Sequence, residues 1–331
     1  MVAHPSGDAE PDKKMYDRID KAERASQPEA RARQGAWNSS ERDPMYVVAG
    51  VTGNTGKVVA ETLLAHGKPV RAVVRSEAKG AEWRRRGAEV VVAELGDALA
   101  LARALAGAAG AYVLLPSQYE SVDARADGEK RTRAIVQAVE SSGVEHVVFL
   151  SAVGAQHASG TGPVGPLHDA EVALSNVKAA VTSVRAAYFM ENWGASLSAL
   201  AQGLLPTFLA LGRAIPMVAT ADAGTVSAKA LLEGGKGYSV IELAGPREYT
   251  PEDVAIALSR NTGKPMTAVQ GPEDAMVSAL MGAGLNRHWA ELYQELTHAL
   301  NKGHMAWEGR PARFVRGSTE IDAVLSKLVR G

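Results

Sequence analysis

From residue 46 on, the chain alternates between short apolar runs and longer segments in which apolar residues recur at helical spacing. The runs are rich in valine and apolar on both faces, which is typical of parallel strands covered on both sides. They lie at Tyr46–Val51, Val70–Val74, Glu89–Val92, Ala111–Leu115, His146–Leu150 and Val181–Ala187. The helical segments between them are Thr55–His66, Glu77–Arg86, Ala98–Leu105 and Ser121–Ser142. This alternation predicts an α/β fold with a Rossmann-type doubly wound parallel sheet.

The C-terminal half is less regular and predicts a smaller mixed lobe. Thr250 predicts a helix start, because a threonine cap is followed by a proline and, three residues on, by Asp253. We expect that helix to run to about Asn261, with Gly263 near its end. Other helices are expected at Phe189–Gln202, Asp222–Leu232, Glu273–Gly284, Arg287–Lys302 and Ile321–Val329, and a strand at Tyr238–Ala244. The sequence therefore divides into a Rossmann domain over 45–188 and a substrate lobe over 189–331, partly interleaved with it.

Residues 1–44 differ from the rest in composition. Charged residues dominate from Asp8 to Arg33, and apolar residues there are isolated. Such a segment buries too little apolar surface to offset the entropy of ordering it. We therefore expect a disordered tail. Met45 directly precedes the first strand, so the tail could also be an over-extended gene start, and a regulatory arm is the less favoured interpretation.

Composition narrows the classes of function. A net charge of −1, from 36 basic and 37 acidic residues, favours neither nucleic acid nor a membrane surface as partner. The absence of cysteine excludes disulfides, thiol catalysis and thiolate metal sites, and the eight histidines show no metal-ligand spacing. No apolar run reaches the roughly 18 residues of a membrane span, and no signal peptide opens the chain. We expect a soluble cytoplasmic protein without a metal site.

Three glycines separate the first strand from the first helix in the stretch AGVTGNTGK. A glycine turn at a helix start points backbone N–H groups at an anion, and the helix dipole adds positive potential. In dinucleotide-binding folds the glycines equivalent to Gly50, Gly53 and Gly56 permit a tight turn, pyrophosphate approach and helix–strand packing, respectively. The spacing is GxxGxxG rather than GxGxxG, so the βαβ context carries the prediction. Lys57 is followed by Val58 instead of Ser or Thr, which excludes a P-loop triphosphatase.

The end of the second strand discriminates between the two nicotinamide dinucleotides. NAD-binding proteins place an Asp or Glu there to bond the ribose 2′-hydroxyl. This chain has Arg75, with Lys79 four residues later. A guanidinium suits a 2′-phosphate through a bidentate contact, whereas a carboxylate would repel it. The sequence predicts NADP(H); a solvated pair of basic residues is the alternative.

Several stretches together resemble the NmrA-like family of atypical short-chain dehydrogenases. They are GVTGNTG at 50–56, VVRS at 73–76, GD at 96–97, VVFLSAVGA at 147–155, VRAAYFMENW at 184–193, IPMVAT at 215–220 and IELAGPREYTPEDVAIALSRNTGKPM at 241–266. The resemblance covers about Met45 to Met266 and extends more weakly beyond. It is nearest to the NADPH-dependent quinone oxidoreductase branch.

The resemblance implies that residues following successive strands hold the cofactor, where ligands of open α/β sheets bind. These are Thr52, Asn54 and Thr55 with the three glycines at the pyrophosphate, Arg75 and Lys79 at the 2′-phosphate, Asp97 beside the adenine, Leu115 and Pro116 at the nicotinamide ribose, and Ser151 and Ala152 at the nicotinamide. Simple strand packing is the alternative, and it is strongest for Leu115.

The catalytic Tyr-x-x-x-Lys dyad of typical short-chain dehydrogenases is absent, because no tyrosine is followed by lysine at the fourth position. His168 stands at the expected place and could donate a proton or bond a substrate carbonyl; a surface or capping role is the alternative. Glu171 is interpreted as a structural hydrogen-bond partner. The catalytic candidates are thus His168 and Tyr188, and a substrate wall or a core segment would be formed by Tyr188, Phe189, Met190, Asn192 and Trp193.

A quinone fits a site without a strong acid, because it accepts hydride readily and its product anion can take a proton from water. Orientation over the nicotinamide could then supply most of the rate. The sequence predicts an NADPH-dependent oxidoreductase for a quinone or a similar small carbonyl acceptor. A non-catalytic NADP(H) sensor that binds a regulatory protein stays open, as does a homodimer. A phenolic ether reductase is disfavoured, since it needs lysine near position 168, and Lys178 is too far along.

Overall fold

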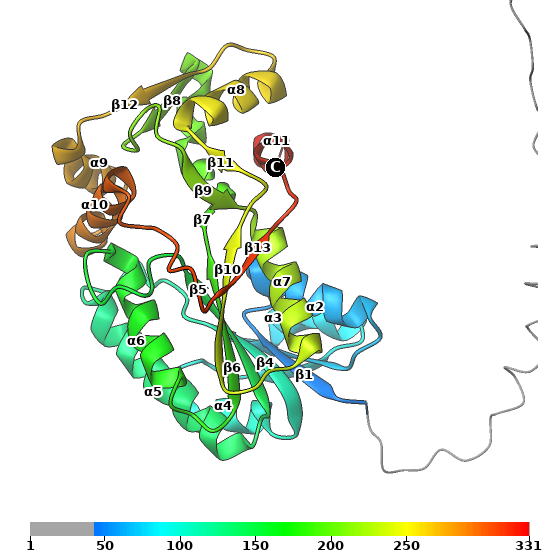
Figure 1. The fold of residues 1–331 in the computed structure, drawn as a ribbon. Coiled ribbons are helices and arrows are strands. Elements are labelled where there is room, and N and C mark those ends of the chain that lie inside the picture. The colour runs from blue at the N-terminus through cyan, green and yellow to red at the C-terminus, as the bar shows by residue number, and fades with distance from the viewer. Residues whose placement is uncertain (1–42, 331) are drawn as a thin grey trace, which may run out of the picture. The chain divides into compact units, whose positions relative to one another are not determined.

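The computed structural model describes residues 43–330. Residues 1–42 of the predicted tail therefore lie outside the described residues. Eight parallel strands form the central sheet (Figure 1). They are β1 Met45–Ala49, β2 Val70–Val74, β3 Glu89–Val92, β4 Ala108–Leu114, β5 His146–Ala152, β6 Ala180–Ala186, β10 Tyr238–Ala244 and β13 Arg313–Arg316. Their spatial order is β13-β10-β6-β5-β4-β1-β2-β3, which places all their carboxyl ends at one edge.

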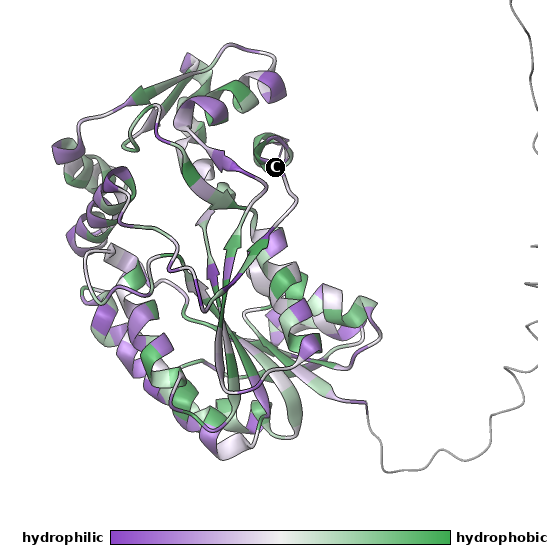
Figure 2. Cartoon of the chain, in the orientation of Figure 1, coloured by the Kyte–Doolittle hydropathy of each residue, from purple (hydrophilic) through white to green (hydrophobic). Residues whose placement is uncertain are grey.

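Helices cover both faces of this sheet, as Figure 1 shows. One face carries α2 Asn54–Ala65, α3 Glu77–Arg85 and α7 Thr220–Glu233, and the other carries α4 Ala98–Leu105, α5 Ala124–Ser142 and α6 Gly165–Leu174. The first face packs around Val59, Trp83 and Leu231, and the second around Leu101 and Ile135. The apolar strands between hydrophilic outer helix surfaces are visible in Figure 2. The predicted doubly wound α/β fold is confirmed.

A smaller lobe lies beyond the carboxyl edge. It contains the short sheets β11-β9-β7 and β12-β8, made of β7 Tyr188–Phe189, β8 Leu204–Thr207, β9 Ile215–Val218, β11 Glu248–Tyr249 and β12 Thr267–Gln270. Its helices are η1 Gly162–Val164, η2 Met190–Gln202, α8 Pro251–Thr262, η3 Glu273–Ala275, α9 Met276–Gly282, α10 Arg287–Lys302 and α11 Ile321–Arg330. They share a second core around Trp193, Leu205, Tyr249, Leu258 and Leu325.

Thr250 begins α8 with the predicted capping box, since its hydroxyl accepts from the Asp253 N–H while the Asp253 carboxylate accepts from the Thr250 N–H. The segment predicted as helical over Phe189–Gln202 is helical from Met190 to Gln202, as a 3-10 helix. One prediction in this half is corrected. The helix predicted over Glu273–Gly284 is split, with a 3-10 turn before α9.

Three elements after residue 189 belong to the larger part of the fold: β10 and β13 are strands of the central sheet, and α7 packs against it. The division at residues 45–188 and 189–331 therefore stays an interpretation of a chain whose residues 44–331 form one compact unit. Within the described residues, no helix combines the length and the apolar character that crossing a bilayer requires.

Candidate active site

The glycine turn lies between β1 and α2. Gly50 has φ +69°, a left-handed conformation that favours glycine, and its carbonyl oxygen accepts from the Gly53 N–H at 2.9 Å. A Cβ on Gly56 would lie 2.4 Å from the Gly50 carbonyl oxygen, so only glycine lets the helix approach the strand this closely. At Gly53 the nearest atom to an added Cβ is 3.4 Å away. The tight turn therefore requires Gly50, and the close helix–strand packing requires Gly56. At Gly53, by contrast, no close contact among the described residues requires a glycine.

The first turn of α2 is suited to an anion. Gly53 occupies the cap position without a side-chain cap, and the first turn holds no acidic residue. The first N–H groups of a helix have no partner within it, and Thr52 and Asn54 are exposed beside them. Thr55 is 6% exposed, and its hydroxyl accepts from Tyr112 at 2.8 Å. Its side chain therefore faces the protein, and its backbone N–H is what it offers to a ligand.

Basic groups follow β2. Arg75 and Lys79 are both exposed, and neither forms an ion pair with another residue in the range 43–330. Asp97 is exposed after β3 and caps α4 by accepting from the Ala100 N–H at 2.9 Å. Both cations therefore lie exposed after β2, and β2 pairs with β1, the strand that leads into the uncapped helix.

The ends of β4 and β5 continue this edge. Leu115 is half-buried and Pro116 exposed after β4, while Ala152 is half-buried at the end of β5. Ser151 is 3% exposed, and its hydroxyl is one of the buried polar atoms in the described part of the chain without a hydrogen-bond partner. A buried hydroxyl normally has a partner. Ser151 is therefore suited to a ligand that supplies one.

His168 lies on α6, half-buried, with its ring held in one orientation. Its Nδ1 lies 2.8 Å from the Ala155 carbonyl oxygen. Because a carbonyl only accepts, Nδ1 carries a proton and donates it. In neutral His168 the other nitrogen, Nε2, is then an acceptor, and it can donate only in the imidazolium form.

The predicted substrate wall divides into two groups. Met190 and Trp193 are 0% and 3% exposed within the second core, so neither offers surface to a ligand here. Tyr188 and Phe189 are half-buried, and Asn192 is exposed. Burial raises the pKa of Tyr188 to about 12, against a smaller lowering by a hydrogen bond with Asn192. Tyr188 therefore keeps its proton at neutral pH.

A buried ion pair holds α6, which carries His168, against the sheet. Arg185 on β6 donates to Glu171 from Nε at 3.0 and 3.1 Å and from Nη2 at 2.6 Å. The two side chains are 6% and 4% exposed. Tyr238 donates to Glu171 at 3.0 Å, and Glu308 pairs with Arg185 from the chain segment after α10. Glu171 has structural partners, in line with its interpretation.

Sequence reasoning missed residues that meet only through the fold. Arg185 on β6 lies opposite Ser151 on β5 in the sheet. Its ion pair with Glu171 could not be predicted from the sequence. A cluster of Tyr119, Trp289 and Tyr293 joins the loop after β4 to α10. The available signal was the spacing of Trp289 and Tyr293, which lie four residues apart and therefore on one face of α10.

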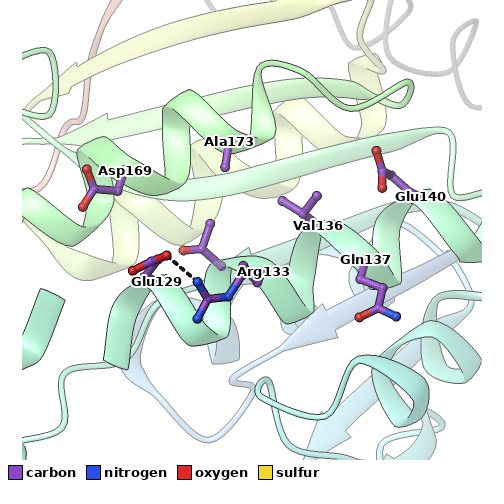
Figure 3. A pocket seen from close by; sticks show the side chains of 8 residues that line it. Glu129, Arg133, Val136, Gln137, Glu140, Asp169 and Ala173 are labelled. Atoms are coloured by element: carbon purple, nitrogen blue, oxygen red, sulfur yellow. Dashed lines mark hydrogen bonds and ion pairs between the residues drawn. The ribbon is translucent and has the colours of Figure 1, made fainter. Parts of the chain in front are cut away.

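Two surface cavities lie away from the predicted cofactor residues. One of about 320 Å³ lies between α5 and α6, where Figure 3 shows Arg133 paired with Glu129 near Val136, Asp169 and Ala173. The other, of about 230 Å³, is lined by the start of α5, residues 158–162 and α10. Their charged lining residues on helix surfaces do not suggest a nicotinamide site.

Comparison with known proteins gives a consistent result. The model of the NmrA-like family matches residues 44–313. An NAD(P)H azoreductase from Xenophilus azovorans is 27% identical over 281 residues, covering 81% of this chain and 94% of the relative. Quinone oxidoreductase 2 of Escherichia coli (strain K12) is 28% identical over 265 residues, covering 78% and 89%. The crystal structure of the E. coli NADPH-dependent quinone oxidoreductase complexed with NADPH superposes with a TM-score of 0.73 at 26% identity, covering 86% of this chain and 99% of that one.

Proposed function

Since the chain belongs to the NmrA-like family, we propose that it is an NADPH-dependent oxidoreductase that transfers a hydride to a quinone or a similar small carbonyl acceptor. The observation that carries the proposal is its similarity to a quinone oxidoreductase and an azoreductase over 89% and 94% of their lengths. The cofactor is NADP(H), as in the related E. coli structure.

The residues present fit this cofactor. The uncapped first turn of α2 offers backbone N–H groups to the pyrophosphate, and the open position at Gly53 leaves room for it. Arg75 is exposed and free to pair with the 2′-phosphate, with Lys79 nearby. The unpartnered hydroxyl of Ser151 suits a polar group at the nicotinamide end. When bound, NADPH supplies the hydride.

His168 and Tyr188 would act on the acceptor in different ways. Neutral His168 presents Nε2 as an acceptor, because Nδ1 is committed to Ala155, so it orients a hydroxyl-bearing substrate and donates only when protonated. Tyr188 remains a phenol at neutral pH and can donate a hydrogen bond to a carbonyl oxygen. With Phe189 and Asn192 it gives the pocket an apolar side and polar groups.

Stopped-flow measurement of NADPH absorbance with substituted 1,4-benzoquinones and the azo dye methyl red tests the proposal. We expect multiple turnovers with NADPH and much slower ones with NADH. Arg75→Ala should lose most of this preference for NADPH, and Lys302→Ala, at the far end of α10, is the matched control for loss of an exposed cation. Tight NADPH binding without reduction of any acceptor would contradict the enzyme and favour the NADP(H) sensor.

A further inference from the structure

The loop after β5, residues 153–161, carries the carbonyl group that orients His168. Ala155 lies in this loop, and its oxygen accepts the His168 Nδ1 proton at 2.8 Å. No helix or strand forms between residues 153 and 161, so the loop depends on other segments for its position. Any movement of the loop therefore changes the support of the His168 ring.

Residues 303–309, which run from the end of α10 toward β13 (Figure 1), interlock with this loop, and we call them the strap. The Gln156 side-chain amide donates to the Ala306 carbonyl oxygen at 2.7 Å. Met305 is 6% exposed, and a Cβ added to Gly154 would lie 2.6 Å from its methyl group. The strap is therefore packed closely against the loop.

Both ends of the strap are fixed. Glu308 pairs with Arg185 on β6, and the Glu242 carboxylate on β10 accepts from the Gly309 N–H at 3.2 Å. At the other end, Gly303 closes α10, and its N–H donates to the Leu300 carbonyl oxygen at 3.1 Å. An opening of the strap is therefore confined to residues 304–307.

Two histidines meet where the strap touches the loop. The rings of His157 and His304 are stacked, with centroids 4.1 Å apart and an interplanar angle of 24°. His157 is half-buried, and His304 is exposed. Two imidazoles stack while at most one of them is charged, whereas two imidazolium ions at this separation repel each other. The contact between strap and loop therefore depends on the protonation of this pair.

Positive charges outnumber negative ones around the pair. The Arg213 guanidinium, from the segment after β8, lies where a side chain on Gly303 would be, directly before His304. Lys302 precedes them as the last residue of α10. The carboxylate of the strap, on Glu308, is already paired with Arg185.

These surroundings set the direction of the effect. Burial lowers the pKa of His157 most, and the charges of His304 and Arg185 lower it further, against smaller raising effects of the His304 backbone and Glu308. A lowered pKa in the closed form means that the open form binds a proton more readily. Acidification below about pH 6.5 therefore favours the open strap.

We propose that the His157–His304 pair is a pH-dependent switch: when both rings carry a proton, their repulsion opens residues 304–307, and the Ala155 carbonyl is released from His168. Opening exposes Met305 and breaks the Gln156 hydrogen bond, so the strap stays closed while at most one ring is charged. The switch goes beyond the proposed function and does not depend on it. For the proposed reaction it means that acid loosens His168, the residue that orients the acceptor.

Hydrogen–deuterium exchange of the full chain at about pH 7.5 and pH 5.5, with labelling times scaled to the intrinsic exchange rate, tests the switch. We expect peptides covering 153–161 and 303–309 to lose about ten-fold in protection at the lower pH, because one extra proton bound by the open form shifts the equilibrium ten-fold per pH unit below about 6.5. Peptides from β4 should not change.

His304→Phe keeps a flat ring for stacking but cannot be charged, so its loop and strap should be equally protected at both pH values. Because His304 is exposed, this variant should fold, and His157→Phe should behave in the same way if it folds. His66→Phe, at the exposed end of α2, is the matched control and should keep the response of the unmodified protein.

The His168 ring reports the coupling without any turnover. In protein labelled with ¹⁵N-histidine, the Nδ1–H signal of His168 is assigned by its absence in His168→Gln. It should be visible at about pH 7.5, where the proton is bonded to Ala155, and should broaden at about pH 5.5 as that bond opens. In His304→Phe the signal should persist at both pH values.

Three results would overturn the inference: equal protection of the loop and strap at both pH values in the unmodified protein, the same loss in His304→Phe, or an equal loss in β4. A His168 signal that persists while the strap opens would overturn the coupling to His168. If the pH response is present but no quinone or azo dye is reduced, the proposed function is wrong and this inference stands.

Discussion

Replacing Glu171 by glutamine should destabilise the protein far more than replacing Asp169 by asparagine, although both carboxylates lie on α6 and each accepts hydrogen bonds from two nitrogens of an arginine. The Glu171–Arg185 pair is 4% and 6% exposed, whereas the Asp169–Arg125 pair, with bonds of 2.7 Å, is 27% and 54% exposed. Glutamine keeps the shape of Glu171 but leaves the buried guanidinium with Glu308 as its remaining carboxylate partner.

The magnitude follows from burial. Breaking one side of a buried pair costs about 3–5 kcal/mol, because a charge is left uncompensated away from water. The remaining Glu308 contact places the expected loss near the lower end, about 3 kcal/mol. An exposed pair is worth about 0–1 kcal/mol. At roughly 2–4 °C per kcal/mol for a chain of this size, the melting temperature of Glu171→Gln should fall by about 6–12 °C.

Thermal and urea unfolding of the two variants and the unmodified protein measure the difference. A third variant, Glu171→Leu with Arg185→Met, removes both buried charges and should recover part of the loss. Equal destabilisation by Glu171→Gln and Asp169→Asn, within about 0.5 kcal/mol, would refute the reasoning that burial decides the worth of these pairs.

Four further predictions test the site and the core. Arg75→Ala should weaken NADPH binding by about one to two decades and leave NADH binding nearly unchanged; equal calorimetric affinities for the two dinucleotides in the unmodified protein would contradict this. His168→Ala should lower quinone turnover about ten-fold without changing NADPH affinity, and identical kinetics would make His168 structural. Gly56→Ala should cost about 1–3 kcal/mol in urea unfolding and weaken NADPH binding, because its Cβ would meet backbone, while Gly282→Ala, in open space, should do neither. Burial lowers the pKa of His146, so below about pH 6.5 the unfolded chain binds a proton at this residue more readily than the folded protein does. The melting temperature should therefore fall as the pH drops below about 6.5, and it should fall less in His146→Gln.

The parts of the fold predicted well from sequence are those whose signals are local. The runs at β2, β3 and β10 are short and rich in apolar residues, and their predicted limits agree with the structure. The cap at Thr250 needs only residues within one helical turn. The same holds for the glycine turn, whose geometry depends on neighbours six residues apart.

The parts missed depend on distant partners. Strand β13 reads RFVR, too short and too charged to be recognised, and it is a strand because it pairs with β10. Strands β8 and β12 likewise stabilise each other across the second lobe. Arg185 lies in an apolar strand where a charge is unexpected. Its partner Glu171 lies on α6, and the two side chains meet because α6 packs against the sheet. Tyr119 and Tyr293 are 174 residues apart, so no spacing in the sequence links them.

The position of β13 at the end of the sheet has a consequence for synthesis on the ribosome. Strand β10 can join β6 as soon as it emerges, but its outer edge waits until residues 245–312 have been translated. At about 5–20 residues per second, that edge stays unpaired for several seconds in each nascent chain. An unpaired edge is a template for pairing with another chain. A premature stop before residue 313 would make this exposure permanent, so C-terminally truncated products should aggregate or be degraded rather than accumulate as a shortened enzyme.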